Sequence, residues 1–111
     1  MTIERVLAQA TVTDLDRAVA WYSTLFGRAP DTEPMSGLLE WHFGPTCGLQ
    51  VWSEPERAGR STVVLDETDL DGLAARLATE GIEHGAIERV TASRALQLAD
   101  PDGNRIVLTG Q

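Results

Sequence analysis

The tetrapeptide Thr13-Asp14-Leu15-Asp16 returns 55 residues later as Thr68-Asp69-Leu70-Asp71. The same offset relates Gly48 to Gly103. A short segment of alternating apolar residues precedes each copy, an amphipathic segment follows it, and further alternating segments come after that. The repeat therefore predicts two equivalent units within 111 residues, each made of a strand, a helix and three more strands.

The segment before the first tetrapeptide shows how each unit begins. Its apolar set is Val6, Ala8, Ala10 and Val12, and this set alternates with Arg5, Leu7, Gln9 and Thr11. Strict alternation is typical of a strand that has only one face on the core. We expect the first set to pack under a helix and the second set to face away from it.

The two tetrapeptides also predict where the helices begin. Thr13 and Thr68 are expected to be the N-caps, with an aspartate three residues later in each case. Gly27 and Gly81 follow the two apolar stripes and are expected to end the helices.

A polar segment separates the two units. Residues 54–60 are rich in charge and in helix-breaking residues, which is typical of a linker. We predict a single domain over residues 1–111, with a first module at about 1–53 and a second at about 61–111.

The composition excludes several classes of function. The net charge is −8 and the pI is about 4.5, so a nucleic acid is not an expected partner. Cys47 is the only cysteine, which rules out an intrachain disulfide and a cysteine-rich zinc site. The chain shows no long apolar run and no signal-like start, so we expect a cytoplasmic protein without a membrane partner.

Two stretches, residues 12–22 and residues 100–106 (Asp-Pro-Asp-Gly-Asn-Arg-Ile), resemble the vicinal oxygen chelate superfamily. This group is also called the glyoxalase, bleomycin resistance protein and extradiol dioxygenase superfamily. The resemblance covers nearly the whole chain. It implies an α+β fold in which two βαβββ modules curl their mixed sheets into a cup, with helices on the outer face. It also implies a homodimer, with the cup closed either within one chain or between two.

Metal-dependent members of this superfamily hold a divalent ion in the cup with ligands from four strand positions. By the resemblance, those positions fall on Leu7, Thr62 and Val107, and on either Trp52 or Gln50. None of these residues is a histidine, aspartate or glutamate. Apolar side chains cannot replace the water around a dication. We therefore expect no metal and no cofactor.

The remaining signal is the number of tryptophans. Trp41 and Trp52 lie in predicted strands of the first module, and we expect both to face the cup, where indoles would stack on a planar ligand. Because neighbours in a strand alternate, His42 would then face away. Packing in the core or at a dimer interface is an equally good explanation of the tryptophans. The complete expected ligand-binding set is Leu7, Gln9, Trp41, Gln50, Trp52, Thr62, Val64, Asp66, Arg105 and Val107.

These observations favour a small-molecule-binding protein of the glyoxalase and bleomycin resistance type, which takes an apolar or aromatic ligand in its cup without metal. The alternative is a glyoxalase-type lyase, isomerase or dioxygenase with a non-standard or absent metal site. An acid–base enzyme using Asp66 or Glu40 is a further form of that alternative, although no catalytic residue is assigned. A third hypothesis is a small regulatory protein whose cup is vestigial.

Overall fold

The computed structural model describes residues 1–111, and its elements follow the predicted βαβββ order twice. The first module contains β1 (Val6–Val12), α1 (Leu15–Phe26), β2 (Thr32–Met35), β3 (Leu38–Gly44) and β4 (Cys47–Ser53). The linker forms one short 3-10 turn, η1 (Pro55–Arg57). The second module contains β5 (Thr62–Asp66), α2 (Leu70–Glu80), β6 (Glu88–Val90), β7 (Ser93–Ala99) and β8 (Arg105–Gly110).

Each module forms its own four-stranded mixed sheet. The strand orders are β1-β4-β3-β2 and β5-β8-β7-β6, which are the same order in the two modules. In each sheet the first strand pairs in parallel with the last, and the other pairs are antiparallel. The α+β fold class and the doubled module are therefore confirmed.

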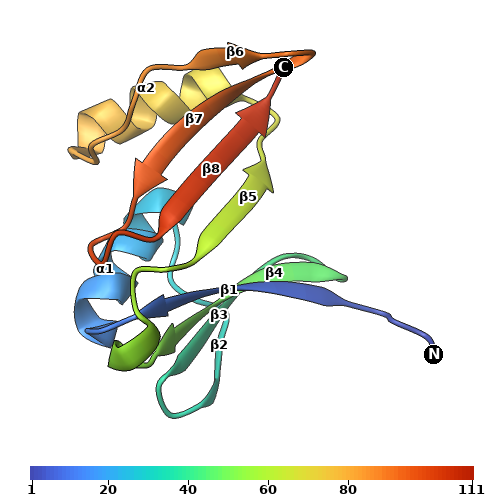
Figure 1. Ribbon diagram of the computed structural model, residues 1–111, viewed down its shortest axis with the longest axis vertical. Coiled ribbons are helices and arrows are strands. Elements are labelled where there is room, and N and C mark those ends of the chain that lie inside the picture. The colour runs from blue at the N-terminus through green and yellow to red at the C-terminus, as the bar shows by residue number, and fades with distance from the viewer.

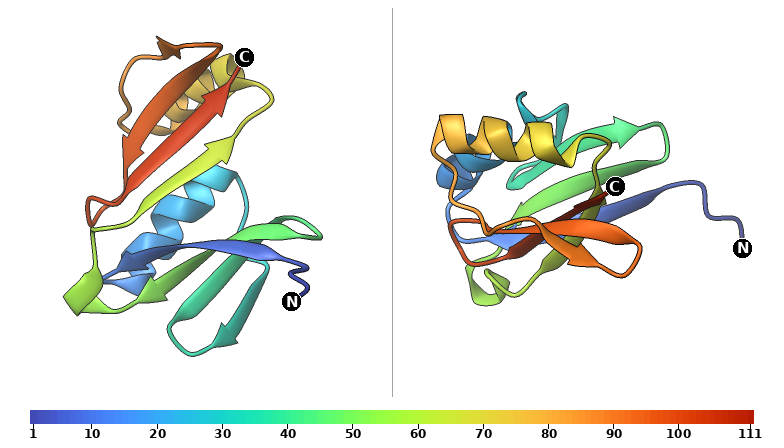
Figure 2. Two further views of the ribbon diagram at one scale, coloured as in Figure 1. Left: turned by 45° about the vertical axis from the view of Figure 1, so that its right-hand side comes forward. Right: turned by 90° about the horizontal axis from the view of Figure 1, so that it is seen from above.

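The two sheets lie next to one another in one layer, and both helices lie behind them (Figure 1). The view from above in Figure 2 shows the same two layers. No strand of one sheet pairs with a strand of the other, so the sheets do not close into a single barrel. We call the side of each sheet that is turned away from the helices its free face. Neither helix has the length and apolar character needed to span a bilayer.

The core lies between the sheets and the helices. On the first sheet, Ala10 and Val12 are fully buried under α1, as the alternation predicts, whereas Val6 of the same predicted set is 67% exposed. Tyr22 and Leu25 are the largest buried residues on the helix that covers them. On the second sheet, Leu96 and Ile106 pack against Leu70 and Leu77 in the same way.

The helix caps differ by one residue from the prediction. Asp14 and Asp69 are the N-caps, and their carboxylates accept hydrogen bonds from the backbone N–H groups of Arg17 and Gly72. The predicted caps Thr13 and Thr68 precede them. A carboxylate caps a helix at least as well as a hydroxyl and also suits the positive end of the helix dipole, so the aspartate takes this position. The predicted helix ends are correct, since Gly27 and Gly81 both adopt left-handed C-cap conformations.

The Asp100–Asn104 turn joins the two modules. Asp100 and Asn104 are buried, and the Asn104 side-chain amide donates to the carbonyl of Thr11 in β1 at 2.7 Å. The Tyr22 hydroxyl of α1 donates to the Asp100 carboxylate at 2.6 Å. Burial of the phenol, followed by its contact with Asp100, raises the pKa of Tyr22. The turn therefore holds β1 and α1 of the first module against β8 of the second.

Candidate functional site

The free face of the first sheet carries three cross-strand rows of side chains. The strand register sets these rows as His42, Gly48 and Leu7; Glu40, Gln50 and Gln9; and Leu38, Trp52 and Thr11. No helix covers this face. Even so, Leu38, Glu40 and Thr11 are all buried, and Glu40 is only 5% exposed. Residues this buried on an uncovered face indicate that the sheet curls around them.

A continuous chain of hydrogen bonds crosses the middle of this face. The Gln9 amide donates to the Gln50 side-chain oxygen at 3.1 Å, and the Gln50 amide donates to one Glu40 oxygen at 2.8 Å. The other Glu40 oxygen lies 2.8 Å from Nε2 of His42. We call these four residues the polar row. They come from β1, β4 and β3, so the row depends on the pairing of all three strands.

The polar row keeps the buried glutamate ionised. The hydrogen bond from Gln50, and after it the one from His42, hold the pKa of Glu40 below its usual value of 4.5. The charge of Arg5 contributes in the same direction. A buried carboxylate is tolerable only with such partners, and both oxygens of Glu40 have them.

Apolar side chains flank the polar row on both sides. Trp52 is half-buried between Leu38 and Thr11 in the register, and its indole N–H donates to Glu54 of the linker at 3.0 Å. Leu7 lies on the other side, next to Gly48. The first sheet therefore presents a half-buried indole and a leucine around a charged and hydrogen-bonded centre.

The prediction for Trp41 was wrong in its orientation. Trp41 is fully buried on the helix side, where its ring centroid lies 5.9 Å from that of Tyr22 and 5.5 Å from that of Phe26. Its neighbour His42 faces the free side instead. The register shifts between His42 and Gly44 at the β3–β4 turn, and a one-residue shift moves every side chain of a strand to the opposite face.

The free face of the second sheet carries the remaining predicted residues. The strand register places Thr62 beside Arg105, Val64 beside Val107, and Asp66 beside Thr109. The Thr109 hydroxyl donates to the Asp66 carboxylate at 2.9 Å. The ten predicted residues therefore fall into three groups: four on the first free face (Leu7, Gln9, Gln50, Trp52), five on the second (Thr62, Val64, Asp66, Arg105, Val107), and Trp41 in the core.

The residues at the implied metal positions do not fit a metal ion. Leu7, Thr62 and Val107 offer at most one hydroxyl, and Gln50 is already bonded to Glu40. No group of three or more histidine, cysteine, aspartate or glutamate side chains is placed to hold an ion. Every buried side-chain nitrogen and oxygen has a protein partner, so no orphaned donor set points at an empty position.

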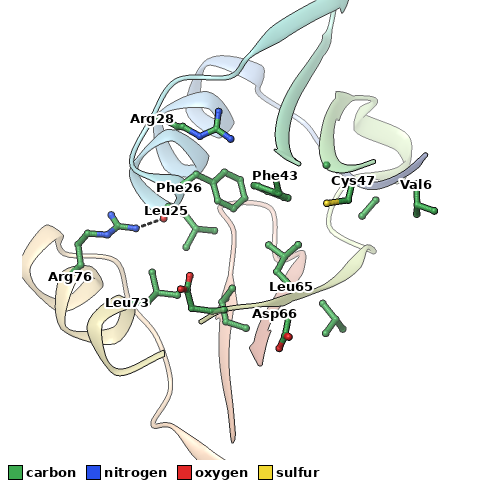
Figure 3. A pocket seen from close by; sticks show the side chains of 15 residues that line it. Val6, Leu25, Phe26, Arg28, Phe43, Cys47, Leu65, Asp66, Leu73 and Arg76 are labelled. Atoms are coloured by element: carbon green, nitrogen blue, oxygen red, sulfur yellow. Dashed lines mark hydrogen bonds between the residues drawn. The ribbon is translucent and has the colours of Figure 1, made fainter. Parts of the chain in front are cut away.

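A second feature, a cleft between the modules, was not expected from the sequence. β1 and β5 meet where Thr11 donates its backbone N–H to the Ser61 hydroxyl, and they diverge from that point (Figure 1). The gap holds a cavity of about 550 Å³ with fifteen lining residues, ten of them hydrophobic. Figure 3 shows Leu25, Phe26, Phe43, Leu65 and Leu73 around it, with Arg28 and Arg76 at its border. We call it the central cleft.

The two arginines beside the central cleft are engaged by protein groups. Arg28 forms an ion pair with Asp31 at 2.6 Å, and Arg76 pairs with Glu80 at 2.9 Å while donating to the backbone of α1. The cleft is therefore mainly an apolar surface. Three of its lining residues are unusually exposed for their type: Val6 at 67%, Val64 at 62% and Phe43 at 42%. This exposure follows from how the two modules diverge, so no pattern in the sequence could have revealed the cleft.

Comparison with known proteins supports the resemblance. The structure matches the crystal structure of a glyoxalase/bleomycin resistance protein from Catenulispora acidiphila with a TM-score of 0.88 and 28% identity, covering 96% of this chain and 97% of that one. It matches TnmS3, an antibiotic binding protein from Streptomyces sp. CB03234, with a TM-score of 0.85 and 25% identity, covering 99% and 98%. A bleomycin-binding protein complexed with bleomycin shares the fold, with a TM-score of 0.80, 20% identity and coverage of 96% and 98%.

No family model and no curated protein matches the chain. The solved structures nevertheless confirm the predicted resemblance to the glyoxalase and bleomycin resistance group.

Proposed function

We propose that this chain binds a small apolar or aromatic molecule on the free face of its first sheet, without a metal ion. The observation that carries the proposal is the curled free face, where the half-buried indole of Trp52 lies beside the polar row. Ligand sites of this kind are mostly apolar with a few well-placed polar groups. The similarity to an antibiotic binding protein at 25% identity supports the same class of function.

A homodimer is part of this proposal. Both free faces lie on the same side of the layer, and Val64 on the second of them is 62% exposed. A second copy placed against this side would cover Val64 and would bring a second-module free face opposite a first-module one. Arg105 of one copy would then bring a positive charge towards an acidic face. Sedimentation of the unmodified chain should show a dimer, and Val64→Asp should shift it towards monomer.

Tryptophan fluorescence tests the ligand proposal directly, because the three indoles lie in different environments. Trp41 is in the core, Trp21 is on α1, and only Trp52 is on a free face. Flat aromatic compounds and glycopeptide-type antibiotics should change the emission in the presence of a chelator. Trp52→Phe should abolish the change, whereas Trp21→Phe, the matched control, should preserve it. An unchanged titration of Trp52→Phe would contradict the proposed location.

The central cleft is a second candidate location for the same ligand class. Its volume of about 550 Å³ lies within the usual range for small-molecule pockets. Phe43→Ser, at its exposed edge, separates the two locations. Binding that requires Phe43 but tolerates Trp52→Phe assigns the ligand to the cleft, and the reverse result assigns it to the free face.

A further inference from the structure

The polar row ends at a histidine that has one nitrogen engaged and the other without a protein partner. Nε2 of His42 lies 2.8 Å from Glu40, and no hydrogen bond to Nδ1 is present. The side chain is 35% exposed, while that of Glu40 is 7% exposed. A buried carboxylate therefore holds an accessible imidazole in a fixed position on the free face.

The backbone of His42 is fixed as well. The pairing of β3 with β2 ends before His42, so side chains rather than a neighbouring strand bond the outer backbone groups of this residue. Asp31 accepts from the His42 backbone N–H at 2.6 Å, and Arg28 donates to the His42 carbonyl. Arg28 and Asp31 also pair with each other, so the backbone N–H and carbonyl of His42 are both bonded to one ion pair. This double anchoring fixes the main chain of His42, and the contact of Nε2 with Glu40 then orients the ring.

The charge of Glu40 decides which nitrogen of His42 carries the proton. An ionised carboxylate only accepts hydrogen bonds, so Nε2 must donate to it. In the neutral imidazole, Nδ1 is then unprotonated and accepts. We propose that Glu40 and His42 form a proton-accepting dyad that binds ligands through an acidic hydroxyl group, such as a phenol or an enol.

The surroundings of His42 on the free face are apolar. Gly48 lies beside His42 in the register, and it carries no side chain on this face. A Cβ at that position would lie 2.9 Å from the Leu7 side chain, so Leu7 already occupies the space next to the glycine. The charged groups around the dyad are Glu40 on the same strand, Arg5 before β1, and the Arg28–Asp31 pair behind the backbone. The ligand hydroxyl would therefore lie between His42 and the apolar surface of Leu7.

The proton balance of the contact is simple. The ligand O–H bond weakens or breaks, and the proton is shared with or passes to Nδ1. The ligand oxygen then carries the negative charge, and the imidazolium lies between that oxygen and Glu40. No oxidant, metal or further reactant is needed. This inference rests on the proposed function, since it names the ligand class of the same free face.

The state of the imidazole can be measured without any ligand. His84, the only other histidine, has its Nδ1 2.8 Å from the carbonyl of Gly85, so in that neutral ring Nδ1 carries the proton. Nitrogen NMR should therefore show opposite tautomers for the two residues, with Nε2 protonated in His42. In Glu40→Gln, the new amide oxygen accepts from Gln50, and its NH₂ group turns towards His42. The His42 tautomer should then switch, and that of His84 should not. A His42 protonated at Nδ1 in the unmodified chain would overturn the proposal.

Paired probes test the ligand class. A nitrophenol and the corresponding nitroanisole, its methyl ether, have nearly the same shape, but only the phenol has the proton. The phenol should bind the unmodified chain roughly tenfold or more tightly than the ether, as a charge-assisted hydrogen bond would. His42→Gln and Glu40→Gln should each remove most of this preference, and His84→Gln should leave it intact.

The possible outcomes separate the two proposals. If the unmodified chain binds both probes with the same affinity, the dyad does not bind the hydroxyl group. The inference then fails, while the proposed function stands. If neither probe binds, the proposed function fails for this ligand class, and the NMR experiment still decides the arrangement of the dyad. The preference for the phenol should also be lost at high pH, because ionisation of the probe removes the donor.

Discussion

The side-chain amide of Asn104 in the second module donates to the carbonyl of Thr11 in the first, across a distance of 2.7 Å. The two residues are 93 positions apart in the chain, and both are buried. Asn104 also donates to Asp100 at 2.7 Å and accepts from the Ser61 backbone N–H at 2.8 Å. A single side chain thereby connects β1, the residue before β5 and the turn before β8.

Asn104→Ala should lower the free energy of unfolding by about 2–3 kcal/mol, because it leaves several buried polar groups without partners. Chemical denaturation followed by circular dichroism measures the change. Gln97→Ala, an exposed polar residue on β7, is the matched control and should stay within about 0.5 kcal/mol of the unmodified chain. Equal effects of the two substitutions would mean that the turn does not hold the modules together.

Tyr22→Phe should destabilise the chain by about 1–3 kcal/mol, since it removes the only hydrogen bond of the buried hydroxyl. Tyr22 and Asn104 both donate to the same oxygen of Asp100. Their effects should therefore not be additive, with a coupling of at least about 0.5 kcal/mol in a double-mutant cycle. Strict additivity would show that the two contacts act independently.

Gly48→Ala should be destabilising by about 1–3 kcal/mol, because a Cβ there would lie 2.5 Å from the Trp41 carbonyl oxygen. Gly44 lies in the same hairpin, and its nearest neighbour to a new Cβ is the Cys47 sulfur at 3.7 Å. Gly44→Ala should therefore be tolerated. Thermal unfolding of the two variants checks the contrast, and similar melting temperatures would argue against the close strand packing at Gly48.

The stability of the fold should depend on pH through Glu40. Its pKa is lower in the folded chain than the usual 4.5, so the contribution is complete above that value and is lost as the pH falls through the folded pKa. Denaturation of the unmodified chain and of Glu40→Gln from pH 7 down to pH 3 measures this. The stability gap between the two should narrow below about pH 4.5. A gap that stays constant with pH would contradict an ionised Glu40 in the polar row.

The sequence was sufficient for the module and its core, because these depend on local periodicity. Val12 and Ala10 lie under α1, as their alternation predicts. The predicted orientation of Trp41 was wrong for a physical reason. All four residues from Leu38 to Trp41 are buried, so alternation between a buried and an exposed face does not mark the orientation of this strand. The assignment then rested on the spacing from a turn, and the irregular register at that turn reversed it.

The polar row was hidden from the sequence for a different reason. Gln9 and Gln50 were predicted to face the ligand, but their link to Glu40 requires the register of three strands. The central cleft depends in addition on how the two modules diverge from Thr11 and Ser61. Neither feature is encoded in the spacing along a single segment. Both result from the way the two modules and their strands are joined.

The most direct test of ligand binding on the free face is NMR of the three indole N–H groups during titration with an aromatic probe in the presence of a chelator. Nitroanisole is suitable because it lacks the hydroxyl group that the dyad is proposed to bind, so the test does not depend on that proposal. The account predicts that the Trp52 signal shifts with saturation, that those of Trp21 and Trp41 stay in place, and that a parallel titration with divalent metal in place of the chelator gives the same result. Saturable binding that leaves Trp52 unchanged and shifts the methyl signals of Leu25 and Leu73 instead would contradict it, as would binding that appears only when metal is added.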